Sequence, residues 1–411
     1  MRILVQKFGG TSVRNLACQK EVLLKVKNGL EQGYKMVVVL SARSGDTNNL
    51  LALAQEWSSD PDPAECDSLV ATGEQVSTAL FSMLLKDNGI KARSLLAPQI
   101  PLLTNGEFGK ARIQSFDKKH LMELLEEYDV LVMAGFQGVT DNGRITTLGR
   151  GGSDTPAVAV AAALSAEFCE IYTDVDGVYT TDPRVCSTAR KLDRVSYEEM
   201  LEMASMGAKI LEIRSVEFAQ KYNVPVHVRS TFTDTPGTML IKEDHKMEDV
   251  LVSGIAFDRD QALITLQKVP DVPGVSAKLF GPLSTASVVV DMIVQSPSVG
   301  GINDIAFTVT KKDLNKALSM VEAMKENVPD LIVSHNPNVC KVSVIGVGMR
   351  NHSGVAACAF EALYRENINI MMISTSEIKI SVLIEEKYTE LAVRALHDSF
   401  ELGHTDTIGD H

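Results

Sequence analysis

Two glycine-rich turns in the sequence have the residue types needed to bind an anion. The first spans residues 7–12 and reads Lys-Phe-Gly-Gly-Thr-Ser, between an apolar run and a helical pattern from about residue 14. Glycines let backbone N–H groups approach a phosphate, and the N-terminus of the following helix adds a favourable dipole. Lys7 supplies a positive charge beside this turn. The pattern predicts a phosphate site, although a tight strand-to-helix turn without a ligand looks the same.

The second turn spans residues 148–156 and reads Leu-Gly-Arg-Gly-Gly-Ser-Asp-Thr-Pro. Thr155 is predicted to cap a helix that has Pro156 at its first position and runs to Leu164. The guanidinium of Arg150 has the geometry to bind a carboxylate with two parallel hydrogen bonds. Capping alone would also explain the turn, but two such turns in one domain favour a phosphate ligand. The GxxxxGK[ST] loop and the HRD and DFG triplets of protein kinases are absent from the sequence.

A third cluster, residues 172–184, combines carboxylates, hydroxyls and an arginine. It follows a predicted strand, and open α/β sheets bind ligands at the carboxyl ends of their strands. The carboxylates here would face a ribose or a metal, but the spacing does not fit an EF-hand. An ordinary loop or hairpin rich in Asp, Gly and Pro remains the alternative.

The elements that must position these turns alternate between strands and helices up to about residue 240. Strands are predicted at 3–8, 36–42, 130–136, 170–174 and 225–229. Several are apolar throughout, as in a parallel or mixed sheet covered on both faces. Val76, Leu80, Met83 and Leu84 recur at helical spacing and predict an amphipathic helix that ends at 88–89. The sequence therefore indicates an α/β fold.

Composition narrows the class of protein. A chain of 411 residues is long enough for two or three domains. Its 40 Lys+Arg against 53 Asp+Glu give a net charge of −13, which opposes a nucleic-acid or membrane-surface partner. Six scattered cysteines lack zinc spacing and are expected to be reduced, and no signal peptide or bilayer-length apolar run is seen. The expectation is a cytoplasmic protein.

The C-terminal part repeats itself. A charged, turn-rich stretch places a boundary near 240–250. Beyond it, seven residues recur at an offset of 80, which indicates two tandem βαββαβ units. The pairs are Gly274 and Gly354, Val275 and Val355, Ala277 and Ala357, Phe280 and Phe360, Leu283 and Leu363, Met292 and Met372, and Ile293 and Ile373. The alternative is that both are merely short α+β units with similar composition.

Four motifs in register resemble the aspartate kinase family: residues 7–12, Ala71-Thr72-Gly73-Glu74, residues 148–154 and residues 172–184. The resemblance covers essentially the whole chain. It implies an amino-acid-kinase fold, a mainly parallel sheet between helices, at 1–244. Two ferredoxin-like ACT domains, the modules that bind amino-acid effectors in this family, would follow at 250–332 and 333–411.

The resemblance implies that ATP, with Mg²⁺, phosphorylates the side-chain carboxylate of L-aspartate to give 4-phospho-L-aspartate and ADP. This reaction is the first step towards lysine (through diaminopimelate), threonine and methionine. An aspartate carboxylate is already ionised at neutral pH, so catalysis needs alignment and charge neutralisation rather than a general base.

The resemblance also assigns residues, with Lys7 and Asp154 as the catalytic pair. ATP would contact Lys7, Phe8, Gly9, Gly10, Thr173, Asp174, Tyr179, Asp182, Arg184 and Lys209. Aspartate would contact Ser41, Thr47, Glu74, Arg150, Gly151, Gly152 and Ser153. Arg150 would clamp the substrate α-carboxylate and Glu74 would face its ammonium. By helical phase, Glu74 lies opposite the apolar stripe, where a simple solvated glutamate is the alternative. No set of protein metal ligands is predicted.

One segment departs from the family pattern. Residues 41–48 read Ser-Ala-Arg-Ser-Gly-Asp-Thr-Asn, where the family usually has methionine in place of Arg43. Arg43 adds a charge near the substrate entrance, which bears on substrate affinity rather than on the reaction class.

Regulation is expected at the repeats. By the same resemblance, an effector would contact Asp271, Gly274, Ser276, Gln295, Gly354, Asn369 and Ile370. Feedback inhibition by lysine, threonine or both would act between ACT units of different subunits, which requires a dimer or tetramer. Two other functions stay open at this point. They are a related kinase of glutamate, carbamate or a nucleotide monophosphate, and a catalytically silent amino-acid sensor.

Overall fold

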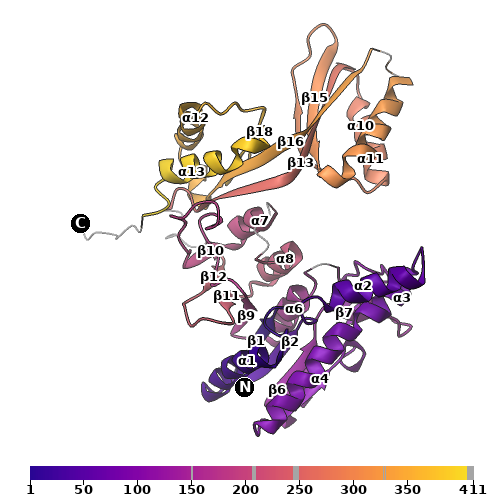
Figure 1. The fold of residues 1–411 in the computed structure, drawn as a ribbon, viewed down its shortest axis with the longest axis vertical. Helices are drawn as coiled ribbons and strands as arrows, with labels where there is room; N and C mark the ends of the chain where they lie inside the picture. The colour runs from indigo at the N-terminus through magenta and orange to yellow at the C-terminus, as the bar shows by residue number, and fades with distance from the viewer. Residues whose placement is uncertain (150, 206–209, 244–249, 327, 329, 405–411) are drawn as a thin grey trace. The chain divides into compact units, whose positions relative to one another are not determined.

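The computed structural model describes residues 1–149, 151–205, 210–243, 250–326, 328 and 330–404 (Figure 1). The chain forms two compact units. The first comprises Met1–Val178 and Lys191–Asp244, and the second comprises Tyr179–Arg190 and His245–His411.

An eight-stranded sheet forms the centre of the first unit, in the order β10-β12-β11-β9-β1-β2-β6-β3. Within its described residues only β11 and β12 pair antiparallel, so the predicted mainly parallel sheet is confirmed. The strands are β1 Ile3–Phe8, β2 Lys35–Leu40, β3 Ala92–Leu95, β6 Val130–Ala134, β9 Phe168–Thr173, β10 Arg194–Ser196, β11 Val226–Ser230 and β12 Thr238–Ile241. Five of them match the strands predicted from the sequence to within two residues.

Helices cover this sheet because its central strands are apolar on both faces. Leu4 and Phe8 of β1 pack in one core with Val22 and Val26 of α1 and with Phe81 of α4. Helix α6 packs against β1, β9 and α8. The helices of this unit are α1 Leu16–Glu31, α2 Asp46–Trp57, α3 Pro63–Val70, α4 Thr72–Asp87, α5 Lys118–Glu127, α6 Asp154–Leu164, α7 Tyr197–Ser205 and α8 Ile213–Tyr222.

Helix α4 forms where the apolar spacing predicts it, but the opposite face is buried. Val76, Leu80 and Met83 are exposed by 41%, 43% and 60%. The buried face carries Phe81 and Leu85 among small hydroxyl residues, and Glu74 lies on it. Two hydroxyls of this face bond to the helix's own carbonyls, that of Ser77 to Gly73 and that of Thr78 to Glu74, so these two polar groups are paired although they are buried. The solvated glutamate expected as the alternative for Glu74 is therefore wrong.

Helix α6 begins at Asp154, two residues before the predicted first position at Pro156. Its N-cap residue is Ser153 rather than Thr155. Turn bonds carry the chain into the helix, because the N–H of Gly152 donates to the carbonyl of Gly149 and that of Asp154 donates to Gly151. Thr155 and Pro156 are therefore buried inside the first turn.

A small four-stranded sheet, in the order β5-β4-β7-β8, adjoins these elements in the first unit. Its strands are β4 Leu103–Thr104, β5 Ile113–Ser115, β7 Gln137–Val139 and β8 Ile145–Thr147. Strand β8 leads directly into the second glycine turn. Helix α3 packs against β8.

The second unit contains one six-stranded sheet, in the order β14-β15-β13-β16-β18-β17. Its strands are β13 Gly254–Pro270, β14 Val290–Gln295, β15 Ile302–Val309, β16 Ile332–Ile345, β17 Met372–Thr375 and β18 Lys379–Glu385. The helices are α10 Val275–Thr285, α11 Leu314–Ala323, α12 Val355–Arg365 and α13 Thr389–Ser399.

Both repeats use the two long strands of this sheet. Residues 261–267 of β13 pair with the first half of β16, and residues 254–258 pair with its second half. Each repeat therefore takes its fourth strand from the first strand of the other, which joins the two βαββαβ units into one sheet.

The segment Tyr179–Arg190 folds with the second unit. The Thr180 hydroxyl lies 2.9 Å from Nε2 of His397 in α13, and the Thr180 carbonyl accepts from the N–H of Ile255. Arg394 of α13 donates to the carbonyl of Val185.

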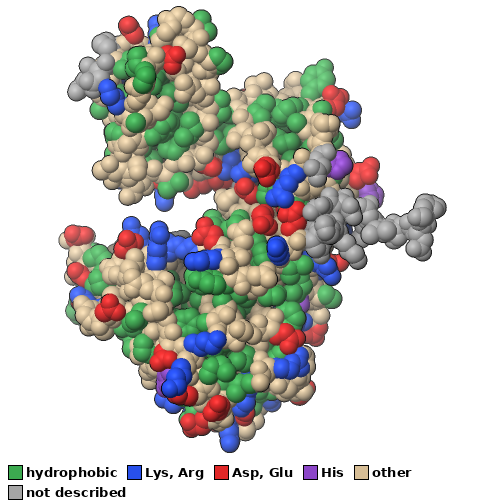
Figure 2. Space-filling view, turned by 180° about the vertical axis from the view of Figure 1, so that it is seen from behind, with side chains coloured by type: hydrophobic (Ala, Val, Ile, Leu, Met, Phe, Trp, Pro, Cys, Tyr) green, Lys and Arg blue, Asp and Glu red, His purple; other side chains and the backbone are tan. Residues whose placement is uncertain are grey.

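Charged side chains of both signs are interspersed with hydrophobic ones on the face drawn in Figure 2. Among the described residues, no helix combines the length and the apolar character needed to cross a bilayer.

Candidate active site

Lys7 and Asp154 form an ion pair where β1 meets the start of α6. Lys7 Nζ lies 2.5 Å from Oδ1 of Asp154, and the two side chains are only 12% and 7% exposed. Oδ2 of Asp154 also accepts from the N–H of Glu212 at 3.3 Å. The structure thus brings together the two residues predicted to be catalytic, and it keeps both charges partly withdrawn from water.

The first glycine turn is held by neighbouring strands. The Gly9 N–H donates to the carbonyl of Tyr172 in β9, and the ring of Phe8 stacks on that of Tyr172 at 4.7 Å. The Gly10 carbonyl accepts from the N–H of Ser44. A Cβ on Gly10 would lie 2.8 Å from the carbonyl oxygen of Ala42, so the close approach requires glycine there. Because the Gly9 amide is already bonded, Gly10 is the better candidate of the two to face a phosphate.

Glu74 lies in the first turn of α4 with its side chain buried. Its Oε1 accepts from the N–H of Ala42 at 2.9 Å, whereas Oε2 is buried and has no hydrogen-bond partner within the described structure. Burial raises the pKa of the Glu74 carboxyl to about 7, and the charge of Asp46 adds to the rise. A buried carboxylate oxygen without a partner is suited to receive a cationic group from a ligand.

The loop after β2 carries the other residues predicted near the substrate. Ser41 is half-buried and its N–H donates to the carbonyl of Phe8, and Thr47 lies in the first turn of α2. Arg43 pairs with Asp46, its Nε lying 2.7 Å from Oδ2. The extra charge expected from Arg43 is therefore largely balanced within its own loop.

The second turn lies against the end of β6. Gly151 adopts a φ of 71°, in the region that favours glycine. Ser153 is buried, and a Cβ on Gly135 would come within 2.7 Å of its Oγ. Gly152 is buried beside them. Arg150, predicted to clamp the substrate, lies outside the described residues.

The residues predicted to hold the nucleotide are divided between the two units. Thr173 ends β9 in the first unit and Asp174 follows it, and the Thr173 hydroxyl donates to the Asp174 carboxylate at 3.0 Å. Tyr179, Asp182 and Arg184 belong to the second unit. There Arg184 donates to both oxygens of Asp182 and lowers the pKa of that carboxyl. Lys209 lies outside the described residues.

The amino acid kinase family model matches residues 2–230, and the ACT domain model matches residues 267–324 and 342–400. The aspartate kinase of Pseudomonas putida is 53% identical over 98% of this chain and 98% of its own length. The chain belongs to the aspartate kinase family. It is therefore an enzyme, a kinase that carries ACT regulatory domains.

Solved structures of this family agree with that assignment. E. coli aspartokinase III in complex with aspartate and ADP, its R-state, superposes with a TM-score of 0.80 at 29% identity. The same protein with lysine and aspartate, its T-state, gives a TM-score of 0.76 at 29% identity. Each comparison covers 97% of this chain and 99% of the other.

The effector positions predicted for an aspartate kinase lie in the second unit and are mostly exposed. Gly274 precedes α10 with a φ of 89°, so this turn requires glycine, whereas Gly354 precedes α12 with an ordinary φ of −94°. The two repeats thus build their helix starts differently. The exposed residues are Asp271, Gly274, Ser276, Gln295, Gly354 and Asn369, and Ile370 is half-buried.

Sequence reasoning missed two buried acidic residues that bond to neighbouring segments of the first unit. Glu170 of β9 accepts from Gln6 of β1 and from Arg229 of β11, which links three neighbouring strands of the sheet. Asp67 of α3 bonds to Gly109 and Thr147. Neither lies in a recognisable motif. The one available signal was that of Glu170, a carboxylate within the largely apolar strand β9.

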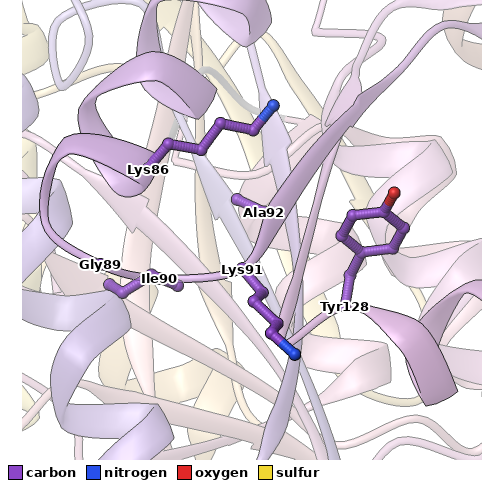
Figure 3. A pocket seen from close by; sticks show the side chains of 6 residues that line it. All are labelled: Lys86, Gly89, Ile90, Lys91, Ala92 and Tyr128. Atoms are coloured by element: carbon purple, nitrogen blue, oxygen red, sulfur yellow. The ribbon is translucent and has the colours of Figure 1, made fainter.

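A hollow in the first unit is lined by Lys86, Gly89, Ile90, Lys91, Ala92 and Tyr128 (Figure 3). It lies at the amino end of β3, whereas the two glycine turns follow the carboxyl ends of β1 and β8. The side chains of Lys86 and Lys91 point in different directions. The hollow contains none of the residues predicted for catalysis.

Proposed function

We propose that this enzyme transfers the γ-phosphoryl group of ATP to the side-chain carboxylate of L-aspartate, giving 4-phospho-L-aspartate and ADP. The observation that carries the proposal is the buried Lys7–Asp154 ion pair beside the first glycine turn. A lysine and a backbone amide neutralise charge on a transferring phosphoryl group without any proton transfer. The aspartate and ADP bound by E. coli aspartokinase III support these ligands.

In this reaction a substrate carboxylate oxygen forms the new bond to phosphorus while the bond from phosphorus to ADP breaks. Lys7 and the Gly10 amide would stabilise the transferred group, and Asp154 would orient Lys7. Mg²⁺ would accompany ATP, since this cation is usually held by one or two carboxylates together with phosphate oxygens. Asp154 is a carboxylate of that kind. The described residues hold no cluster of three metal-ligating side chains, so the phosphates would supply most of the ligands.

We propose that the enzyme recognises its substrate by the opposite charges of the substrate's ammonium and α-carboxylate groups. Glu74 has a buried oxygen free to accept from the substrate ammonium. The family resemblance is the ground for proposing the remaining substrate contacts, which are Arg150, Ser41, Thr47 and the turn at 151–153. The ATP contacts of Phe8, Gly9, Thr173, Asp174, Tyr179, Asp182, Arg184 and Lys209 are proposed on the same ground.

Initial rates of ADP release with a panel of acceptors test this function. We expect L-aspartate to support turnover, with L-glutamate, carbamate and UMP giving rates near the background. Preferred turnover of any of the other three would replace the proposed substrate.

We propose the catalytic domain at 1–244 and ACT domains at 250–332 and 333–411. Lysine, threonine or both would inhibit by binding the ACT domains of a dimer or tetramer, as suggested by the lysine complex of E. coli aspartokinase III. The product would lead towards lysine, threonine and methionine. Rates measured at millimolar lysine, threonine and their mixture test the regulation, and three unchanged rates would contradict it.

A further inference from the structure

The carboxylate of Asp67 is buried and fully engaged by hydrogen bonds. Asp67 lies in α3 and is only 2% exposed. Its two oxygens accept the N–H of Gly109 at 3.0 and 2.9 Å. Oδ2 also accepts the N–H of Thr147 at 2.7 Å, and Oδ1 accepts the Thr147 hydroxyl at 2.7 Å. A buried charge is tolerated when it is satisfied in this way, and hydrogen bonds to an ionised group are the stronger kind.

Asp67 holds the segment that precedes the second glycine turn. Thr147 is the last residue of β8, and Leu148 and Gly149 follow it into the turn. The Thr147 carbonyl accepts from the N–H of Ala111 at 2.8 Å. A Cβ on Gly149 would lie 3.3 Å from the carbonyl oxygen of Gly109. Asp67 thus joins two backbone segments, at 109–111 and 147–149, at the point where the turn leaves the strand.

The backbone of Asp67 leads to the other side of the proposed substrate pocket. The Asp67 carbonyl accepts from the N–H of Ala71, which ends α3 and directly precedes α4. Glu74 lies in the first turn of α4. The side-chain amide of Gln137, from the small sheet, donates to the Ala71 carbonyl at 3.3 Å. One residue therefore links the start of the glycine turn to the helix that carries Glu74.

We propose that Asp67 is a positioning residue for the amino-acid substrate. It fixes the spacing between Glu74 and the glycine turn, and it touches neither substrate nor nucleotide. This inference rests on the proposed function. A carboxylate is required because an amide offers one acceptor oxygen and turns an NH₂ group towards N–H donors, which leaves buried groups unpaired.

The test compares Asp67→Asn with Glu65→Gln. Glu65 lies on the same helix and pairs with Arg144 before β8, but its side chain is 74% exposed, so the control removes a surface link between the same two elements. Steady-state KM values for aspartate and for ATP are measured for each variant, and thermal unfolding shows that each is folded. A merely structural role would change both KM values or neither.

For Asp67→Asn we expect the KM for aspartate to rise roughly tenfold or more, the size of one lost bond to a charged group. The KM for ATP should stay within about twofold, and Glu65→Gln should match wild type. An unchanged KM for aspartate, or an equal rise for both substrates, would overturn the proposal. Wild-type enzyme that does not phosphorylate aspartate would instead refute the proposed function.

Should Asp67→Asn fail to fold, Thr147→Val decides the question. It removes only the hydroxyl that bonds to Asp67 and keeps the backbone bond. We expect a smaller but selective rise in the KM for aspartate. An unchanged KM for aspartate in this variant would overturn the proposal.

Discussion

Lys7 and Asp154 are 147 positions apart in the sequence, yet Nζ of one lies 2.5 Å from Oδ1 of the other. The pair joins the end of β1 to the first turn of α6, so each of the two glycine turns supplies one partner. Asp154 balances the charge of Lys7 and holds its ammonium group in place. A phosphoryl group arriving at the turn would therefore meet an ammonium that is already oriented.

Neutralising either member of this pair should abolish most activity. In Lys7→Ala and in Asp154→Asn we expect kcat to fall on the order of 10² to 10³, as when one preorganised electrostatic group is lost. Each single change also leaves a poorly hydrated charge unpaired, which costs about 3 to 5 kcal/mol for a buried pair. Steady-state rates and denaturant unfolding measure the two effects. A double variant, Lys7→Met with Asp154→Asn, should recover stability but not kcat, and wild-type kcat in either single variant would refute the catalytic assignment.

Glu74 should give aspartate utilisation a dependence on pH. Its pKa is raised from 4.5 to about 7 by burial, so the carboxylate that would pair with the substrate ammonium forms as pH rises through 7. We expect kcat/KM for aspartate to rise between about pH 6 and 8 and then level off. Glu74→Gln should lower the plateau and remove this limb of the profile. An identical pH dependence in wild type and Glu74→Gln would show that another group is responsible.

The raised pKa of Glu74 also has a consequence for stability. Between pH 4.5 and about 7 the folded protein binds more protons at this site than the unfolded chain does, so this contribution to stability is present at low pH and declines as pH rises. Denaturant unfolding of wild type and Glu74→Gln across this range measures the difference. The two curves should diverge in slope only within that window. Parallel curves would contradict the assigned shift.

Gly9 and Gly10 provide a matched pair of substitutions in the first turn. A Cβ on Gly10 would meet the carbonyl oxygen of Ala42 at 2.8 Å, whereas on Gly9 the nearest atoms are at 3.8 Å. Gly10→Ala must therefore push the turn away from the loop that holds Ser44. We expect Gly10→Ala to lower kcat/KM much more than Gly9→Ala does, measured with both substrates. Equal effects would mean that the close approach is not what matters.

His397 should make the second unit sensitive to mild acid. Burial lowers its pKa below the ordinary 6.5, and its ring bonds to the Thr180 hydroxyl. Below pH 6.5 the unfolded chain takes up a proton that the folded ring resists, so stability present at neutral pH is lost as pH falls. Unfolding of wild type and His397→Gln between pH 7.5 and 5 isolates this contribution, because the remaining histidines are common to both. The variant should lose less stability over that range, and equal losses would contradict the assignment.

The strands and glycine turns were predictable because each has a local signal: β1 begins with the apolar run 3–5, and the turn that follows β1 has two adjacent glycines. The buried face of α4 was not predictable from hydrophobicity, since hydroxyls such as that of Ser77 are satisfied by the helix itself. That Lys7 and Asp154 meet was expected only from the family resemblance, because the contact depends on which strands are neighbours. Asp67 has no motif, and its role depends on partners 42 and 80 positions away.

Trapping the acyl phosphate with hydroxylamine tests the central claim most directly. With ATP, Mg²⁺ and L-aspartate, the wild-type enzyme should produce aspartyl hydroxamate in an amount equal to the ADP formed, and L-glutamate should give none. Lys7→Ala, shown to be folded, should lose both products together. ADP release without hydroxamate, or hydroxamate formation that persists in Lys7→Ala, would contradict phosphoryl transfer to aspartate at this site.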